Sequence, residues 1–102
     1  MKKPTITIVK GDSFEKTFKM EQSNSLIAKV YFTSKDLNLQ KELSYDSTHD
    51  VYTLSLTKDE TADLREVLTT YDITVQFSDD KILTVVYKDL IHILPKINKV
   101  TY

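Results

Sequence analysis

The residue with the most suggestive chemical neighbours in this sequence is His49. It lies three residues after Asp46 and directly before Asp50. An imidazole beside carboxylates can hold a metal ion or transfer a proton. One histidine and two aspartates in a polar segment make an incomplete ligand set, however, because a stable metal site needs more donors held in place. The segment is more typical of a solvent-exposed hairpin loop.

Three other features could take part in chemistry, and each has a simpler structural reading. His92 could transfer a proton, but its apolar neighbours favour an edge or partly buried histidine bonded to backbone. The carboxylates of residues 58–66 could cleave a glycosidic bond, but lysine and arginine among them favour a solvated face. Residues 78–81 lack the oxygen series that calcium requires. A small hydrolase would need a pocket that joins either histidine to a carboxylate.

Composition narrows the function classes further. The 102 residues predict one domain spanning 1–102. The net charge of −1 argues against a nucleic-acid partner, and no apolar run is long enough to span a membrane. There is no cysteine, so disulfides and thiolate chemistry are excluded, and the first residues do not fit a secretory signal. We expect no enzymatic activity and no cofactor or metal ion.

The elements that would position these residues are mostly short β-strands. The clearest run lies where every second residue from Tyr71 to Phe77 is apolar. In the run over 26–34, every second residue from Leu26 to Phe32 is expected on the buried face, with Tyr31 on the other. Similar runs, with a weaker one over 39–45, cover residues 5–10, 13–20, 51–56, 81–88 and 89–95. The total is about seven or eight strands.

The connections between the runs support this reading. Residues 78–81 and 45–52 predict hairpin loops. The segment from 57 to 68 breaks the two-residue period, and Thr57 with Glu60 forms a capping-box pattern. Apolar residues then recur at helical spacing, so one short helix is predicted near 58–66.

Gly11 is the only glycine in the chain, and it lies between two predicted strands. Glycine adopts positive φ without a Cβ clash, so Gly11 and Asp12 predict a structural turn or bulge where the chain changes direction or sheet. A phosphate-binding loop would need further glycines and a following helix.

Many short strands with frequent turns predict an all-β fold. Two stacked sheets allow the alternating apolar faces to meet in one core. The length fits an immunoglobulin-like antiparallel β-sandwich, although the Cys-Trp-Cys pattern of true immunoglobulin domains is absent. The prediction therefore concerns the architecture alone.

Four short patterns carry a family resemblance: 10–12 (KGD), 30–33 (VYFT), 56–61 (LTKDET) and 71–73 (YDI). The chain from Ile8 to Ile93 resembles small β-sandwich proteins of phages and prophages of Gram-positive bacteria. It is similar to the N-terminal domain of the phage baseplate upper protein. Members commonly carry a glycine before the YDI strand (71–73 here) and another in the hairpin that follows it, where this chain has none.

The resemblance implies a non-enzymatic virion structural or assembly protein, in the baseplate, tail or head. It also implies that the protein binds other phage structural proteins and forms a homo-oligomer. Its location would be the virion, which is assembled in the cytoplasm of the bacterial host. It carries over no catalytic residue.

Candidate contact residues are Tyr31, Ile97, Val100 and Tyr102. The segment that contains the last three either docks on a neighbouring subunit or completes the last strand of the domain. The alternative function is a carbohydrate-binding module for host-surface adhesion, in which Tyr31, Tyr87 and Tyr102 would offer a platform for sugar rings. The absence of tryptophan argues against that alternative without excluding it.

Overall fold

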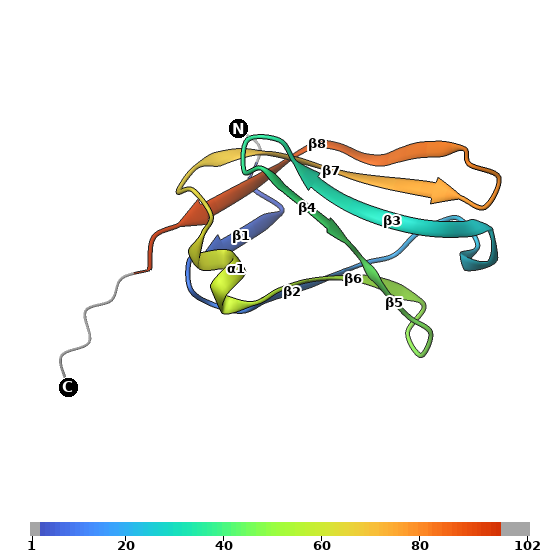
Figure 1. Cartoon of the computed structure of the whole chain (residues 1–102), viewed down its shortest axis with the longest axis horizontal. Helices are drawn as coiled ribbons and strands as arrows, with labels where there is room; N and C mark the ends of the chain where they lie inside the picture. The colour runs from blue at the N-terminus through green and yellow to red at the C-terminus, as the bar shows by residue number, and fades with distance from the viewer. Residues whose placement is uncertain (1–2, 97–102) are drawn as a thin grey trace.

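The computed structural model describes residues 3–96 of the chain. Within this range the polypeptide is mostly β-strand, and two sheets pack face to face (Figure 1). The all-β sandwich predicted from the sequence is confirmed. The elements are, in order, β1 (Ile6–Val9), β2 (Phe14–Phe18), a 3-10 helix η1 (Asn24–Leu26), β3 (Ile27–Ser34), β4 (Leu39–Glu42), β5 (Ser44–Asp46), β6 (Val51–Leu56), α1 (Lys58–Ala62), β7 (Leu68–Phe77) and β8 (Ile82–Leu94).

The strand order is that of an immunoglobulin-type sandwich. One sheet has the order β1-β8-β7-β3-β4 and the other β2-β6-β5. All the described strand pairs are antiparallel except β1 with β8, which run parallel from Ile6 beside Ile91 to Val9 beside Leu94. The predicted antiparallel arrangement does not hold at this one pair, because β1 and β8 run in the same direction.

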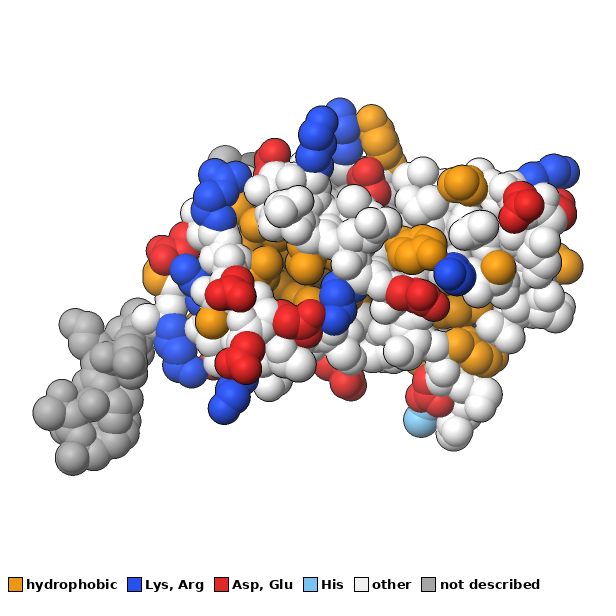
Figure 2. All heavy atoms as spheres, viewed as in Figure 1, with side chains coloured by type: hydrophobic (Ala, Val, Ile, Leu, Met, Phe, Trp, Pro, Cys, Tyr) orange, Lys and Arg blue, Asp and Glu red, His pale blue; other side chains and the backbone are white. Residues whose placement is uncertain are grey.

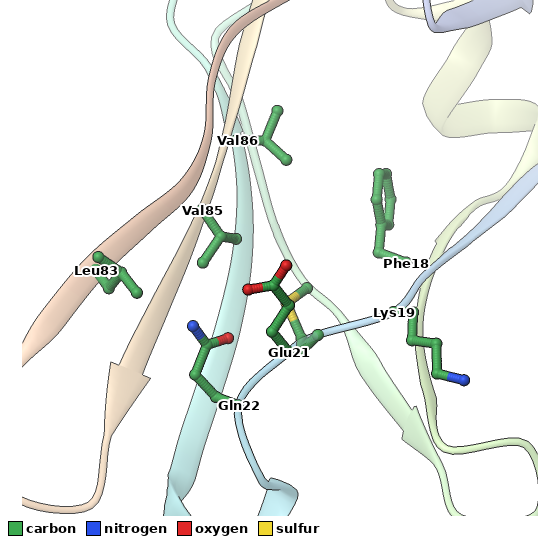
Figure 3. Close-up of a pocket in the computed structure, with 8 residues that line it drawn as sticks. Phe18, Lys19, Glu21, Gln22, Leu83, Val85 and Val86 are labelled. Atoms are coloured by element: carbon green, nitrogen blue, oxygen red, sulfur yellow. The ribbon is translucent and has the colours of Figure 1, made fainter.

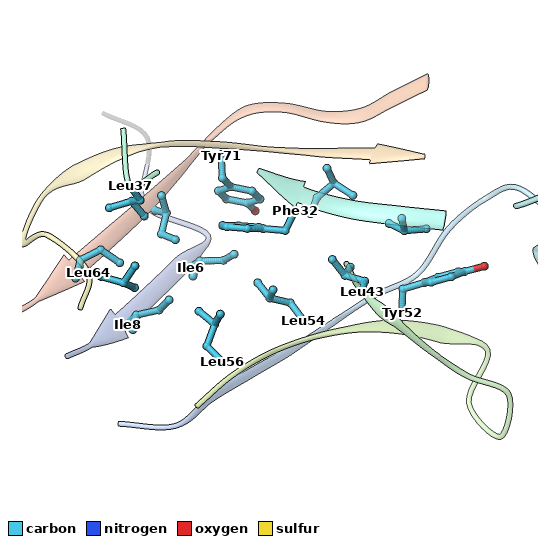
Figure 4. Packing of buried hydrophobic residues seen from close by; sticks show 14 of the residues in the cluster. Ile6, Ile8, Phe32, Leu37, Leu43, Tyr52, Leu54, Leu56, Leu64 and Tyr71 are labelled. Carbon is cyan, nitrogen blue, oxygen red and sulfur yellow. The ribbon is translucent and has the colours of Figure 1, made fainter. Parts of the chain in front are cut away.

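The core lies between the sheets and is filled by the inward faces of both. Ile73 and Val75 of β7 are fully buried, as the alternation predicts. The ring of Phe32 stacks on that of Tyr71, with centroids 5.2 Å apart and an interplanar angle of 24° (Figure 4). The other buried apolar residues are Ile6, Ile8, Val30, Leu37, Leu43, Tyr52, Leu54, Leu56, Leu64, Ile91 and Ile93.

The start of β3 departs from the predicted alternation. Val30 and Phe32 are buried as expected, but Leu26 is 58% exposed and Ala28 is also exposed. The pairing register with β7 shifts between Ile27 and Lys29, which marks a β-bulge. A bulge adds one residue to one strand, so the alternation valid from Val30 onward does not extend back to Leu26.

Three hairpin turns use short polar residues where glycine is common. Asn38, Asp50 and Asp80 have φ of 52°, 52° and 70°. Their side chains tolerate the left-handed conformation better than most. The hairpin predicted over residues 78–81 is confirmed, since β7 and β8 are adjacent and the Phe77 amide donates to the Lys81 carbonyl at 2.8 Å.

The chain crosses between the sheets at residues 10–13. Gly11 lies in this corner with φ of 85°, and the Asp12 amide donates to the Val9 carbonyl at 3.1 Å. The fully buried Thr61, a residue of α1, bonds this corner to the helix. Its Oγ1 accepts from the Gly11 amide at 3.0 Å and donates to the Asp12 carbonyl at 2.7 Å. One hydroxyl therefore bonds two backbone groups that lie 50 and 49 residues earlier in the chain.

Helix α1 begins as the capping box predicts but is shorter than expected. The Thr57 hydroxyl accepts from the Glu60 amide, and the Glu60 carboxylate accepts from the Thr57 amide at 2.9 Å. The helix ends at Ala62 and not near residue 66. Its last turn tightens, with the Leu64 amide bonded to the Thr61 carbonyl, and this places Leu64 in the core.

We predict that Thr61→Val lowers the free energy of unfolding by about 1–3 kcal/mol, because the substitution leaves the Gly11 amide and the Asp12 carbonyl without their partner. Urea unfolding followed by circular dichroism measures this loss. Thr7→Val, on the exposed face of β1, serves as a control and should change stability by less than about 0.5 kcal/mol. Equal stability of both variants would contradict the role assigned to Thr61.

A second prediction concerns the pH dependence of stability. The Lys41 ammonium donates to the Glu60 carboxylate at 2.6 Å, and with the Thr57 amide it holds the pKa of Glu60 below its usual 4.5. A depressed pKa in the folded state means that this carboxylate stabilises the fold above the unfolded pKa, and that the contribution is lost as the pH falls. We expect Glu60→Gln to reduce the difference in urea midpoint between about pH 7 and about pH 3. An unchanged difference would show that Glu60 contributes nothing to it.

Candidate interaction surface

The two sides of the sandwich are closed to different extents. On one side β4 passes directly into β5, and the Leu43 amide between them bonds to the Val30 carbonyl at 2.8 Å. On the other side the corner at residues 10–13 joins the sheets at the α1 end only. Strand β1 pairs with residues 91–94 of β8, so residues 82–88 have β7 on one side and no described strand on the other.

A hollow of about 340 Å³ opens where this side is not closed (Figure 3). Phe18 and Met20 face it from β2 and the segment after it, and Val86 faces it from β8. We call this hollow the open side; its lining residues are Phe18, Lys19, Met20, Glu21, Gln22, Leu83, Val85 and Val86. Its lining is mixed: the residues from β8 are apolar, and the polar or charged Lys19, Glu21 and Gln22 lie in the segment after β2.

Two irregularities in β8 shape the open side. Val86 pairs with Ile73 and Thr84 with Thr74, so Val85 is an extra residue with no partner of its own in the register. Further along, Lys88 has φ of 52°, and its amide donates to the Asp72 carboxylate at 2.7 Å. Neighbouring residues of a regular strand point to opposite faces. Because Val85 lies in the bulge, both Val85 and Val86 line the hollow. The sequence over 81–88 had predicted a regular strand.

A second apolar area adjoins the open side at the β7–β8 hairpin. Leu26, Ile82 and Leu83 are 58%, 69% and 43% exposed. They surround a hollow of about 400 Å³ together with Phe77. Figure 2 shows hydrophobic side chains at the surface toward this end of the molecule. Leu83 lines both hollows, so the open side and this hairpin-end patch adjoin each other.

The histidines do not assemble a chemical site. His49 is 73% exposed, and its Nδ1 lies 2.8 Å from the Asp46 carboxylate, a bond that lowers the pKa of Asp46. Asp50 instead accepts from the Tyr45 hydroxyl at 2.8 Å. His92 is partly buried on β8, on the face opposite to the core residues beside it. Among residues 3–96, no cluster of three or more histidine, aspartate or glutamate side chains could hold a metal ion.

The tyrosines predicted as contacts lie apart from the open side or outside the described residues. Tyr31 is on the outer face of the five-stranded sheet, paired with Glu42 and Thr74. Tyr87 is exposed, with the Lys88 ammonium 5.2 Å from its ring centroid. The other predicted contacts, which lie outside the described residues, are Ile97, Val100 and Tyr102.

A pair of tyrosines that the sequence did not single out lies on the opposite side of the sandwich. The rings of Tyr45 and Tyr52 have centroids 5.0 Å apart. Both line a hollow of about 280 Å³, where Asn24 Nδ2 donates to the Tyr52 hydroxyl at 2.6 Å. Because the two residues come from strands β5 and β6 in register, only the pairing of these strands brings them together.

Comparison with known proteins adds no family assignment. No protein-family model matches the chain, and no curated protein sequence matches it. Over the described residues, no helix is both long and apolar enough to cross a membrane. The resemblance drawn from the four sequence patterns therefore stays a prediction.

Proposed function

We propose that this protein is a non-enzymatic structural or assembly component of a phage or prophage virion and acts through protein–protein contacts at its open side. The observation that supports this proposal is the hollow between β2 and β8, which is lined mostly by apolar residues and lies beside strand edges that no described strand covers. Exposed strand edges and apolar patches are the features through which sheet proteins bind neighbours.

The energetics favour a partner at this surface. Leu26, Ile82 and Leu83 are large apolar side chains that remain largely in contact with water. Full burial of such a side chain contributes about 1.5–3 kcal/mol, so a partner that covers several of them gains enough to offset part of the entropy lost on association. Because these residues adjoin the open side, one partner can cover both areas.

The phage setting comes from the sequence resemblance and not from the geometry. Within it, the partners are other phage structural proteins, and the protein is a homo-oligomer in a particle assembled in the host cytoplasm. No catalytic residue is assigned, because the resemblance carries none and the pair of His49 with Asp46 is largely exposed to solvent.

We expect the purified protein to self-associate as its concentration rises, and Leu83→Glu to move the association midpoint to at least about tenfold higher concentration, equivalent to about 1.4 kcal/mol. A carboxylate at this position would place a charge in the apolar interface. Light scattering at several concentrations measures the shift. Thr84→Glu is the matched control, since Thr84 pairs with Thr74 on the outer face of the sheet. A protein that stays monomeric, or equal shifts for both variants, would argue against this proposal.

Glycan binding for host adhesion is a second candidate, and the paired Tyr45 and Tyr52 favour it. Tyr45 is partly exposed beside a polar hollow, and sugar rings stack on tyrosine faces. A glycan array tests this function. Specific binding that is lost in Tyr45→Ala and kept in Tyr87→Ala would support a lectin, whereas no binding by the parent protein would discard it.

A further inference from the structure

We propose that residues 97–102 of one copy add as a strand to the outer edge of β2 in a second copy and place their inward side chains at the open side. This inference rests on the proposed function, because it names the occupant of the surface described above. The acceptor lies wholly within the described residues, and the donor is the segment that follows them.

The edges of β2 and β8 border the open side, and of these two β2 has the more regular backbone. It pairs with β6 over five consecutive residues without a register shift, from Phe14 beside Leu56 to Phe18 beside Tyr52. No described strand lies on its other edge. The facing edge of β8 has a bulge at Val85 and a second irregularity at Lys88, and bulges disrupt the row of amides and carbonyls that an added strand would use.

The donor segment has the composition of a strand. Its sequence, INKVTY, contains four residues of types enriched in strands, isoleucine, valine, threonine and tyrosine. Six extended residues span about 20 Å, which is enough to cover the five residues of β2. Alternation places Asn98, Val100 and Tyr102 on one face, so this face is the one that fits the open side.

Side chains on both faces of β2 suit this donor. Lys16 points to the same side as Phe14 and Phe18, and its ammonium lies 5.7 Å from the centre of the Phe18 ring. The amide oxygen of Asn98 or the hydroxyl of Tyr102 can accept from that ammonium. On the outer face, the exposed Glu15 carboxylate can pair with the Lys99 ammonium, as opposite charges do on neighbouring strands.

The topology favours a second copy over the same chain. The Lys96 ammonium is bound to the Asp12 carboxylate at 2.7 Å, so the donor begins beside the corner at residues 10–13. Strand β8 is second in its sheet, inside β1, whereas the acceptor edge lies outside β2. The donor would have to cross over that corner to reach its own β2, and connections at one end of a sandwich rarely cross. A second copy presents the same edge without a crossing.

Cysteine cross-linking tests the proposal, because the chain has no cysteine of its own. Single variants Thr17→Cys on the acceptor and Thr101→Cys or Lys99→Cys on the donor are mixed and oxidised. A disulfide requires Cα atoms within about 7 Å, so a mixed dimer reports adjacent strands. We expect at least tenfold faster mixed-dimer formation with Thr17→Cys than with Thr48→Cys, a control in the exposed β5–β6 turn. Adding Val100→Asp to the donor should abolish the faster cross-linking to Thr17→Cys, because Val100 is on the inward face of the proposed strand. Thr101→Asp in the Lys99→Cys donor should leave the faster cross-linking unchanged, because Thr101 is on the outward face.

Two results would overturn the inference. One is equal cross-linking rates for Thr17→Cys and Thr48→Cys. The other is a double variant, Thr17→Cys with Lys99→Cys, that closes its disulfide within one chain at every dilution. If Leu83→Glu still weakens association in either case, the proposed function stands and only the named occupant fails. If Leu83→Glu has no effect while the cross-link forms, the donor strand binds without the apolar contact assigned to the open side.

Discussion

The structure depends on one constraint, which is that the chain must leave the five-stranded sheet after β1 and enter the three-stranded sheet at β2 within four residues. Gly11 supplies the positive φ that this corner requires, and the buried Thr61 hydroxyl pairs with backbone groups on both sides of the Gly11–Asp12 peptide bond. The same corner sets the direction of β1, which explains why β1 runs parallel to β8 in a sandwich whose other described pairs are antiparallel.

The shortness of β1 has a direct consequence for the surface. Ile6 and Ile8 cover the core beside residues 91–94 of β8, and the sandwich is closed at that end. Beyond them no described strand continues along the edge, so the apolar faces of Phe18 and Leu83 are only partly covered. The open side is therefore the far end of the core itself and not a separate pocket, which accounts for the apolar residues in its lining, Phe18, Met20, Leu83, Val85 and Val86.

Much of this fold could be predicted from the sequence, because local signals determine it. Alternation located β7 and the strands beside it, and the Thr57–Glu60 pattern located the start of α1. The misses share a non-local cause. The bulges in β3 and β8 depend on which strand each residue meets, and the positive φ at Lys88 is supported by a bond from its amide to Asp72 on another strand. The open side escaped prediction for the same reason, since Phe18 and Val86 are 68 positions apart and meet only after both sheets form.

The two strand edges that border the open side differ in a way that bears on selectivity. Strand β8 is protected from pairing by its irregular backbone, as natural edge strands commonly are. Strand β2 keeps a regular backbone but carries an inward lysine, Lys16, among phenylalanines. An inward charge makes a purely apolar strand a poor match, because the ammonium would be buried without an acceptor. A strand with oxygen acceptors on its apolar face avoids this cost, so Lys16 can make the edge selective for a mixed donor while it opposes indiscriminate aggregation.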